Sequence, residues 1–259
     1  MKLTHLSAFA GLLASSLVVC SAPAQAFSFT TNLGPGSVAP KGNIWLESVT
    51  LEDSTVITDF TLVDRVDLLS NDLHTGGNSG AASSDLGDNA TEGVKLEVAT
   101  PESLETSLGN LNLNSIVDTE DSGSFKMNLF FERSVDSLYL WERGMNSRLR
   151  LQAIDAAGNL LGNFLDVYSA NFDYAGFNID TREISGQQRV GSRGISLLDL
   201  GVDSPFAGVQ VTSFRSSNGP DFKIVGSSES VPEPATLAGI GIVAGSMAFA
   251  RRRKASAQA

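Results

Sequence analysis

The sequence has very few residues of the kinds that carry thiol or imidazole chemistry. It contains one cysteine, Cys20, and two histidines, His5 and His74, in 259 residues. Cys20 and His5 both stand in an N-terminal stretch that has the features of a cleaved export signal. The remaining chain then offers no cysteine for a disulfide, for a thiolate nucleophile or for a zinc site built on sulfur.

Sequence signatures of catalysis are also missing. His74 is the sole histidine outside that stretch, and the chain contains no G-x-S-x-G nucleophile motif and no phosphate-binding loop with its lysine. Glu132 and Glu142 fall on neighbouring predicted strands and form a conceivable pair for glycoside hydrolysis, but an acidic protein offers many such pairs. We therefore expect no enzymatic activity.

Basic residues are scarce relative to acidic ones. The chain has 18 Lys and Arg residues against 29 Asp and Glu residues, which gives a formal net charge of −11. This excess of negative charge argues against binding to nucleic acid or to an anionic membrane surface. It is compatible with cation binding or simply with solubility outside the cell.

Residues 1–26 have the pattern of a secretory signal peptide. Lys2 supplies a positive start, residues 6–20 are apolar, and residues 24–26 provide the small residues of a cleavage site. Cleavage there would leave Phe27 as the new N-terminus. The alternative, a lipoprotein cut before Cys20, has a valine where a small residue is expected.

The C-terminal segment combines a Pro-Glu-Pro sequence, an apolar run and a cluster of cations. After a flexible polar linker at 227–231, the uncharged residues 235–250 are followed directly by the cations of 251–254. Positive charge beside a membrane span stays in the cytoplasm, so we expect a transmembrane helix at 235–250 rather than a buried core helix. At about 1.5 Å per residue the run spans roughly 24 Å, short of the ~30 Å hydrocarbon core, which suits a segment held only until it is cut.

Residues 232–259 resemble a PEP-CTERM sorting signal, which has the same order of proline pair, apolar run and arginine cluster. The resemblance implies a membrane-embedded exosortase as processing partner. It also implies a precursor that is exported across the inner membrane, anchored by its C-terminal helix, and then delivered to the cell surface or extracellular matrix. The residues that the resemblance assigns to recognition and to membrane orientation are Pro232, Glu233, Pro234, Arg251, Arg252 and Arg253.

The body, residues 27–226, is long enough for one domain with a sizeable core. Apolar residues alternate with polar ones in residues 124–132, 134–142 and 147–155, which is typical of half-buried strands. Turn residues separate these and further short segments. We therefore predict an all-β fold, an antiparallel β-sandwich with a jelly-roll-like strand order as one form of it, and one or two short helices.

One of these helices is predicted just after residue 99. Thr100 is a suitable N-cap, Pro101 fits the first turn, and Gly109 ends the helical pattern. By contrast, residues 70–92 have almost no apolar periodicity, and we expect a loop there.

The middle of the chain carries a second resemblance. The segments "SNDLHTGGNSGAASSDLGDNATEG", "NLNLNSIVDTEDSGSFKMNLFFE" and "LWERGMNS" are similar to a cyanobacterial group of exosortase-dependent surface proteins. In that group the same body precedes a PEP-CTERM tail. The resemblance implies location and architecture and assigns no activity.

The expected loop holds candidate calcium ligands. Asp85, Asp88, Asn89 and Glu92 offer oxygen atoms close together in sequence, and calcium takes about six to eight oxygen ligands. The spacing lacks the order of an EF-hand, so a polar, turn-rich loop without metal is the alternative. A second acidic group around Asp118, in "VDTEDSGS", is either a plain hairpin turn or a further ligand arm.

Aromatic residues near turns are candidates for stacking on sugar rings. Tyr139 and Trp141 stand just before the turn in "LWERGMNS", and Trp45, Tyr168 and Tyr174 are further candidates. The alternative is that each ring belongs to the core and that its charged neighbours form a surface pair.

Together these patterns predict an exported structural or matrix protein, processed by an exosortase and associated with exopolysaccharide. The alternative function is a calcium-dependent carbohydrate-binding module. In the first case no metal is required, and in the second the cofactor is calcium.

Overall fold

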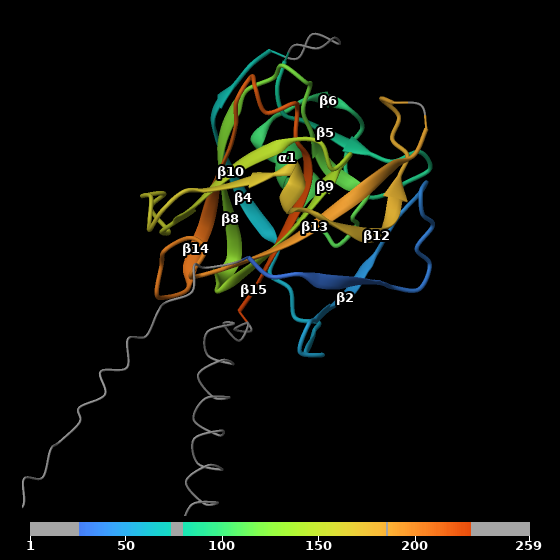
Figure 1. The fold of residues 1–259 in the computed structure, drawn as a ribbon. Helices are drawn as coiled ribbons and strands as arrows, with labels where there is room; N and C mark the ends of the chain where they lie inside the picture. The colour runs from blue at the N-terminus through green and yellow to red at the C-terminus, as the bar shows by residue number, and fades with distance from the viewer. Residues whose placement is uncertain (1–25, 74–79, 185, 229–259) are drawn as a thin grey trace, which may run out of the picture. The chain divides into compact units, whose positions relative to one another are not determined.

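The fold is built almost entirely from antiparallel strands, as the alternation in the sequence predicts. The computed structural model describes residues 26–73, 80–184 and 186–228. Strands occur from Phe29 to Ser227 and form three sheets (Figure 1). The predicted signal peptide, apart from Ala26, and the predicted transmembrane helix lie outside the described residues. Within the described ranges, no helix is both long and apolar enough to cross a membrane.

The strands pair antiparallel throughout the three sheets. The three-stranded sheet has the order β1 (Phe29–Leu33), β2 (Leu46–Leu51), β3 (Val56–Ile57). The five-stranded sheet has the order β11 (Leu165–Tyr168), β10 (Arg148–Ile154), β14 (Phe206–Ser213), β8 (Phe125–Val135), β4 (Val63–Asn71). The seven-stranded sheet has the order β12 (Asp173–Ile179), β13 (Gln188–Ser196), β9 (Ser137–Arg143), β15 (Asp221–Ser227), β7 (Ser115–Asp118), β5 (Ser83–Leu86), β6 (Glu97–Val98).

One core lies between the five-stranded and the seven-stranded sheets. β10 alternates as predicted, with Leu149, Leu151 and Ala153 buried in this core, and the facing side chains include Leu138 and Leu140 of β9. Burial of apolar surface at about 25 cal/mol per Å² holds the two sheets together. The predicted antiparallel sandwich is confirmed, and the jelly-roll-like order stays a prediction.

A second core covers the opposite face of the seven-stranded sheet. It joins Leu46 and Val49 of the three-stranded sheet to Tyr139 and Trp141 of β9. The seven-stranded sheet therefore has no fully solvated face along β9, and every residue of that strand is buried. The sequence predicted β9 as a half-buried strand, which is wrong because the three-stranded sheet packs onto its second face.

The predicted helix is confirmed as α1 (Pro101–Leu108). The Thr100 hydroxyl accepts a hydrogen bond from the Ser103 backbone N–H, and the Ser103 hydroxyl in turn accepts one from the Thr100 N–H. Leu104 and Leu108 enter the first core. A single short 3₁₀ turn, η1 (Ser169–Asn171), is the other helical element among the described residues.

The expected loop at 70–92 contains a buried strand instead. β5 (Ser83–Leu86) pairs with β7 and β6, and all four of its residues are buried. Ala81 and Ala82 precede this strand and pack in the first core, and Leu86 is the one large apolar residue of the strand. A strand with a single apolar residue has no apolar alternation to reveal it, which is why the periodicity argument missed it.

Candidate functional site

The sorting signal follows directly after the folded strands. β15 ends at Ser227 and is hydrogen-bonded on both sides, to β9 and to β7. All its residues are buried, so the last described strand is a central one. The residues predicted for recognition and orientation (Pro232, Glu233, Pro234, Arg251, Arg252 and Arg253) lie outside the described residues.

The four predicted calcium ligands do not form one group. The Asp88 carboxylate lies 3.5 Å from the Lys41 ammonium, which also lies 3.4 Å from Asp180. Glu92 is exposed, and the Asn89 backbone is left-handed, with φ of 67°. Of the four, Asp85 alone is fully buried, because it lies on β5, a strand of the seven-stranded sheet whose residues are all buried. The predicted set is therefore divided between a surface turn and a buried cluster.

The buried cluster forms around Arg143 at the end of β9. The sheet register places Arg143 opposite Asp221 of β15, and the β15–β7 register brings Asp118 beside Asp221. Asp85 comes from β5, the next strand along. Glu183 reaches in from the segment between β12 and β13, which a bridge between Gly87 and Thr181 attaches to the end of β5.

Arg143 contacts four carboxylates in this cluster. Its Nη2 lies 2.7 Å from Asp118 Oδ1, 2.7 Å from Asp221 Oδ2 and 3.2 Å from Glu183 Oε2. Its Nη1 lies 3.7 Å from Asp85 Oδ2, beyond hydrogen-bonding distance, and donates a hydrogen bond to the Thr181 hydroxyl. One guanidinium therefore faces four carboxylates.

The electrostatics of the cluster follow from burial. Desolvation raises the pKa of Asp85 to about 6, against the opposing charge of Arg143. Desolvation, together with the neighbouring Asp221, raises the pKa of Asp118 well above its usual range. A single positive charge does not offset the loss of hydration of this many carboxylates.

Glu142, the neighbour of Arg143, points to the opposite face of β9 and is almost fully buried. Its Oε1 accepts a hydrogen bond from the Ser147 hydroxyl at 2.5 Å. Burial raises the pKa of Glu142 to about 8. Glu132 is exposed on β8 of the other sheet, so the two glutamates do not line a common cleft.

Tyr139 and Trp141, the predicted sugar-stacking residues, lie inside the second core. Tyr139 is 0% exposed and Trp141 is 1% exposed. The Phe29 ring packs edge-on against both, at centroid distances of 5.1 and 5.4 Å, and the Trp141 indole N–H donates to the Thr31 hydroxyl. The expectation that these rings are open to a sugar is corrected, because β1 covers them.

A different aromatic surface lies on the outer face of the five-stranded sheet. Phe164, Tyr168 and Phe214 are exposed by 55%, 48% and 37%. The Arg150 guanidinium lies 3.9 Å from the centroid of the Phe164 ring, and Arg148 lies 4.9 Å from that of Tyr168. These contacts combine exposed rings and cationic donors on one face.

Asp166 and the sheet register hold this surface in place. The Asp166 carboxylate accepts hydrogen bonds from both Arg148 and Arg150, at 2.7 to 2.9 Å. Polar side chains continue across the sheet, and the Gln210 amide donates to Asn128 at 3.0 Å. Sequence reasoning placed the arginines on the outward face of β10 but did not connect them to the flanking phenylalanines, which stand just outside the strands.

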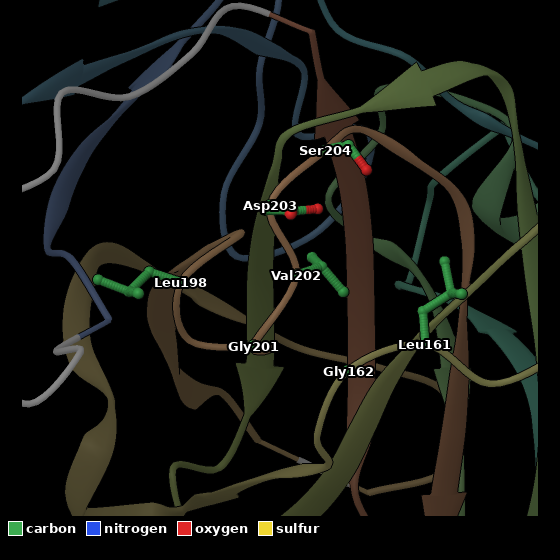
Figure 2. Close-up of a pocket in the computed structure, with 7 residues that line it drawn as sticks. All are labelled: Leu161, Gly162, Leu198, Gly201, Val202, Asp203 and Ser204. Carbon is green, nitrogen blue, oxygen red and sulfur yellow. The ribbon is translucent and has the colours of Figure 1, made fainter.

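A surface pocket lies between two loops that flank the sandwich (Figure 2). It has a volume of about 530 Å³ and is lined by Leu161, Gly162, Leu198, Gly201, Val202, Asp203 and Ser204. Asp203 is the one ionisable side chain in this lining. The pocket thus places no acid–base pair or nucleophile–base pair around a bound molecule.

Comparison with known protein families identifies a sorting motif at the C-terminal end of the sequence. The family model described as the PEP-CTERM protein-sorting motif matches residues 230–254. No curated protein and no solved structure matched the chain. The motif supports an exported protein whose membrane-anchored precursor is processed by an exosortase, and its first residue comes shortly after the end of β15.

Proposed function

We propose that this chain is an extracellular structural protein, delivered by exosortase processing and associated with exopolysaccharide at the cell surface or in the matrix. The observation that carries the proposal is the position of the sorting motif. It begins at residue 230, whereas the last central strand ends at Ser227. Cleavage within the motif would therefore remove the tail and leave every strand of the sandwich intact.

The outer face of the five-stranded sheet supports the association with polysaccharide. Sugar rings present C–H faces that pack on exposed aromatic rings, and their hydroxyls pair with arginine, amide and carboxylate groups. Phe164 and Tyr168 supply such rings beside Arg148 and Arg150. No catalytic step belongs to this proposal, and the likeness to cyanobacterial surface proteins remains a prediction from sequence.

Processing is tested by the C-terminal peptide mass of the protein from the surface fraction of its native cells. We expect a chain that ends near Val231 to Pro234, and we expect a variant with Ala at positions 232, 233 and 234 to stay membrane-bound and unprocessed. A wild-type chain that still ends at Ala259, or normal release of the variant, would contradict exosortase processing.

Polysaccharide association is tested by co-sedimentation with the exopolysaccharide of the same cells. A Phe164→Ala, Tyr168→Ala double variant is expected to bind about thirtyfold more weakly, since two aromatic contacts of about 1 kcal/mol each add to about 2 kcal/mol. The control is Val56→Ala, which trims an apolar side chain 53% exposed on β3 of the three-stranded sheet. Equal binding by the double variant and the control would reject the proposed surface.

The second candidate function, a calcium-dependent carbohydrate-binding module, is favoured by one observation. Asp85, Asp118 and Glu183 bring carboxylate oxygens within 4.8 Å of one another. Under this alternative, calcium removal would abolish polysaccharide binding, whereas under the first proposal binding persists in chelator.

A further inference from the structure

The cluster around Arg143 contains buried carboxylate oxygens that accept no hydrogen bond from the Arg143 guanidinium. Asp118 directs Oδ1 to Arg143, but its buried Oδ2 accepts no hydrogen bond from any described residue. Both Asp85 oxygens are buried without a close hydrogen-bond donor in the described part of the chain, and Oδ2 has only the longer ion pair of 3.7 Å with Arg143. Leaving a buried polar atom without a partner is destabilising, and more so for a charged group. A cation bound among these oxygens would supply such a partner.

The spacing of the oxygens matches a particular size of cation. One oxygen each from Asp85, Asp118 and Glu183 lie no more than 4.8 Å apart. Two ligands on opposite sides of calcium are separated by up to about 5 Å, because calcium–oxygen bonds are about 2.3–2.6 Å long. Magnesium, with bonds of about 2.0–2.1 Å, spans only about 4.2 Å and requires stricter octahedral geometry. Calcium accommodates any separation up to this bound, and its flexible coordination tolerates ligands held by a rigid sheet.

The charge of the cluster favours a dication. Four carboxylates surround the single guanidinium of Arg143, which leaves a formal charge of −3 if all are ionised. A calcium ion on the far side of Asp118 from Arg143 would reduce this to −1. It would also give the Asp85 and Asp118 oxygens the partner that they lack.

We propose that Asp85, Asp118 and Glu183 bind one calcium ion at the end of the seven-stranded sheet. Asp85 and Asp118 come from the buried strands β5 and β7 and form the fixed side of the site. Glu183, whose side chain is 20% exposed, is the most accessible of the three and marks the side from which the ion enters. The ion would tie the segment between β12 and β13 to β5 and β7. This inference does not rest on sorting or on polysaccharide association.

The test is calcium titration of the full chain, purified in detergent and stripped with chelator, followed by calorimetry and by thermal unfolding. We expect one calcium ion per chain, a Kd of about 10⁻⁴–10⁻³ M as in other extracellular calcium modules, and a higher Tm at saturating calcium. Magnesium at the same concentration is expected to leave Tm unchanged. Absence of both heat and a Tm shift in the folded wild type would overturn the proposal, and an equal shift with magnesium would overturn the choice of ion.

Two substitutions and a matched control locate the site. Asp85→Asn and Glu183→Gln are each expected to weaken calcium binding by about tenfold or more, because each removes a charged ligand. Asp88→Asn removes the same charge from the neighbouring surface turn, where Asp88 pairs with Lys41, and is expected to bind like wild type. If Asp85→Asn fails to fold, the calcium affinity of Glu183→Gln is sufficient to test the site. Wild-type affinity in Glu183→Gln, or loss of binding in Asp88→Asn, would reject this site.

Discussion

The buried carboxyl of Glu142 gives the sharpest prediction for the stability of this fold. Glu142 is 1% exposed, and burial raises its pKa from 4.5 to about 8. Between these values the folded state holds a proton that the unfolded state releases. The stabilising contribution of protonated Glu142 is therefore complete below about pH 4.5 and is lost as the pH rises through about 8.

The size of this effect follows from the pKa difference. Each pKa unit corresponds to about 1.4 kcal/mol, so full ionisation of Glu142 lowers the free energy of unfolding by on the order of 5 kcal/mol. Glu142→Gln keeps the shape of the side chain and an acceptor for the Ser147 hydroxyl but cannot ionise. We expect the variant to match wild type within about 1 kcal/mol near pH 4.5 and to become progressively more stable than wild type toward pH 8.5.

The assay is urea denaturation of both proteins at a series of pH values from about 4.5 to 8.5, with the free energy of unfolding extrapolated to water. Glu132→Gln is the control, because it makes the same substitution at an exposed position on β8. For Glu132→Gln, the difference in the free energy of unfolding from wild type should show no gain toward high pH like that of Glu142→Gln. If the difference between Glu142→Gln and wild type also stays constant, the argument from burial is refuted.

Two further predictions concern the cluster and the helix. Arg143→Met leaves three buried carboxylates and the partly exposed Glu183 without their cation and is expected to lower the free energy of unfolding by about 3–5 kcal/mol, measured in urea at neutral pH; a loss under about 1 kcal/mol would mean that the ion pairs contribute little. Thr100→Ala removes the hydroxyl that accepts from Ser103 and is expected to cost about 1 kcal/mol, whereas Thr106→Ala, on the exposed side of α1, serves as control. Equal losses in these two variants would show that the cap is not the cause.

Local sequence patterns were sufficient to predict those strands and the helix whose formation depends on residues close by in the sequence. β10 alternates because an extended chain turns successive side chains to opposite faces, so its leucines and arginines could be assigned to inner and outer faces directly. α1 begins where the Thr100 hydroxyl can satisfy a free backbone N–H, and this too is a local effect. The order of the proline pair, apolar run and arginine cluster likewise identified the sorting motif without any folded structure.

Pairing between distant segments decided the rest. The burial of Trp141 depends on β1, which starts more than a hundred residues earlier, and the cluster joins β5, β7, β9 and β15 through their register. Asp85 and Asp118 were each noted as candidate ligands, but nothing in their spacing indicated that Arg143 and Glu183 would meet them. Residues 70–92 illustrate the same limit, because a strand with only one apolar residue, Leu86, is recognised only by the neighbours that cover it. The sorting motif indicated export and local periodicity indicated the fold class and the faces of single strands, whereas the sites depend on sheet register, which brings together side chains that are far apart in the chain.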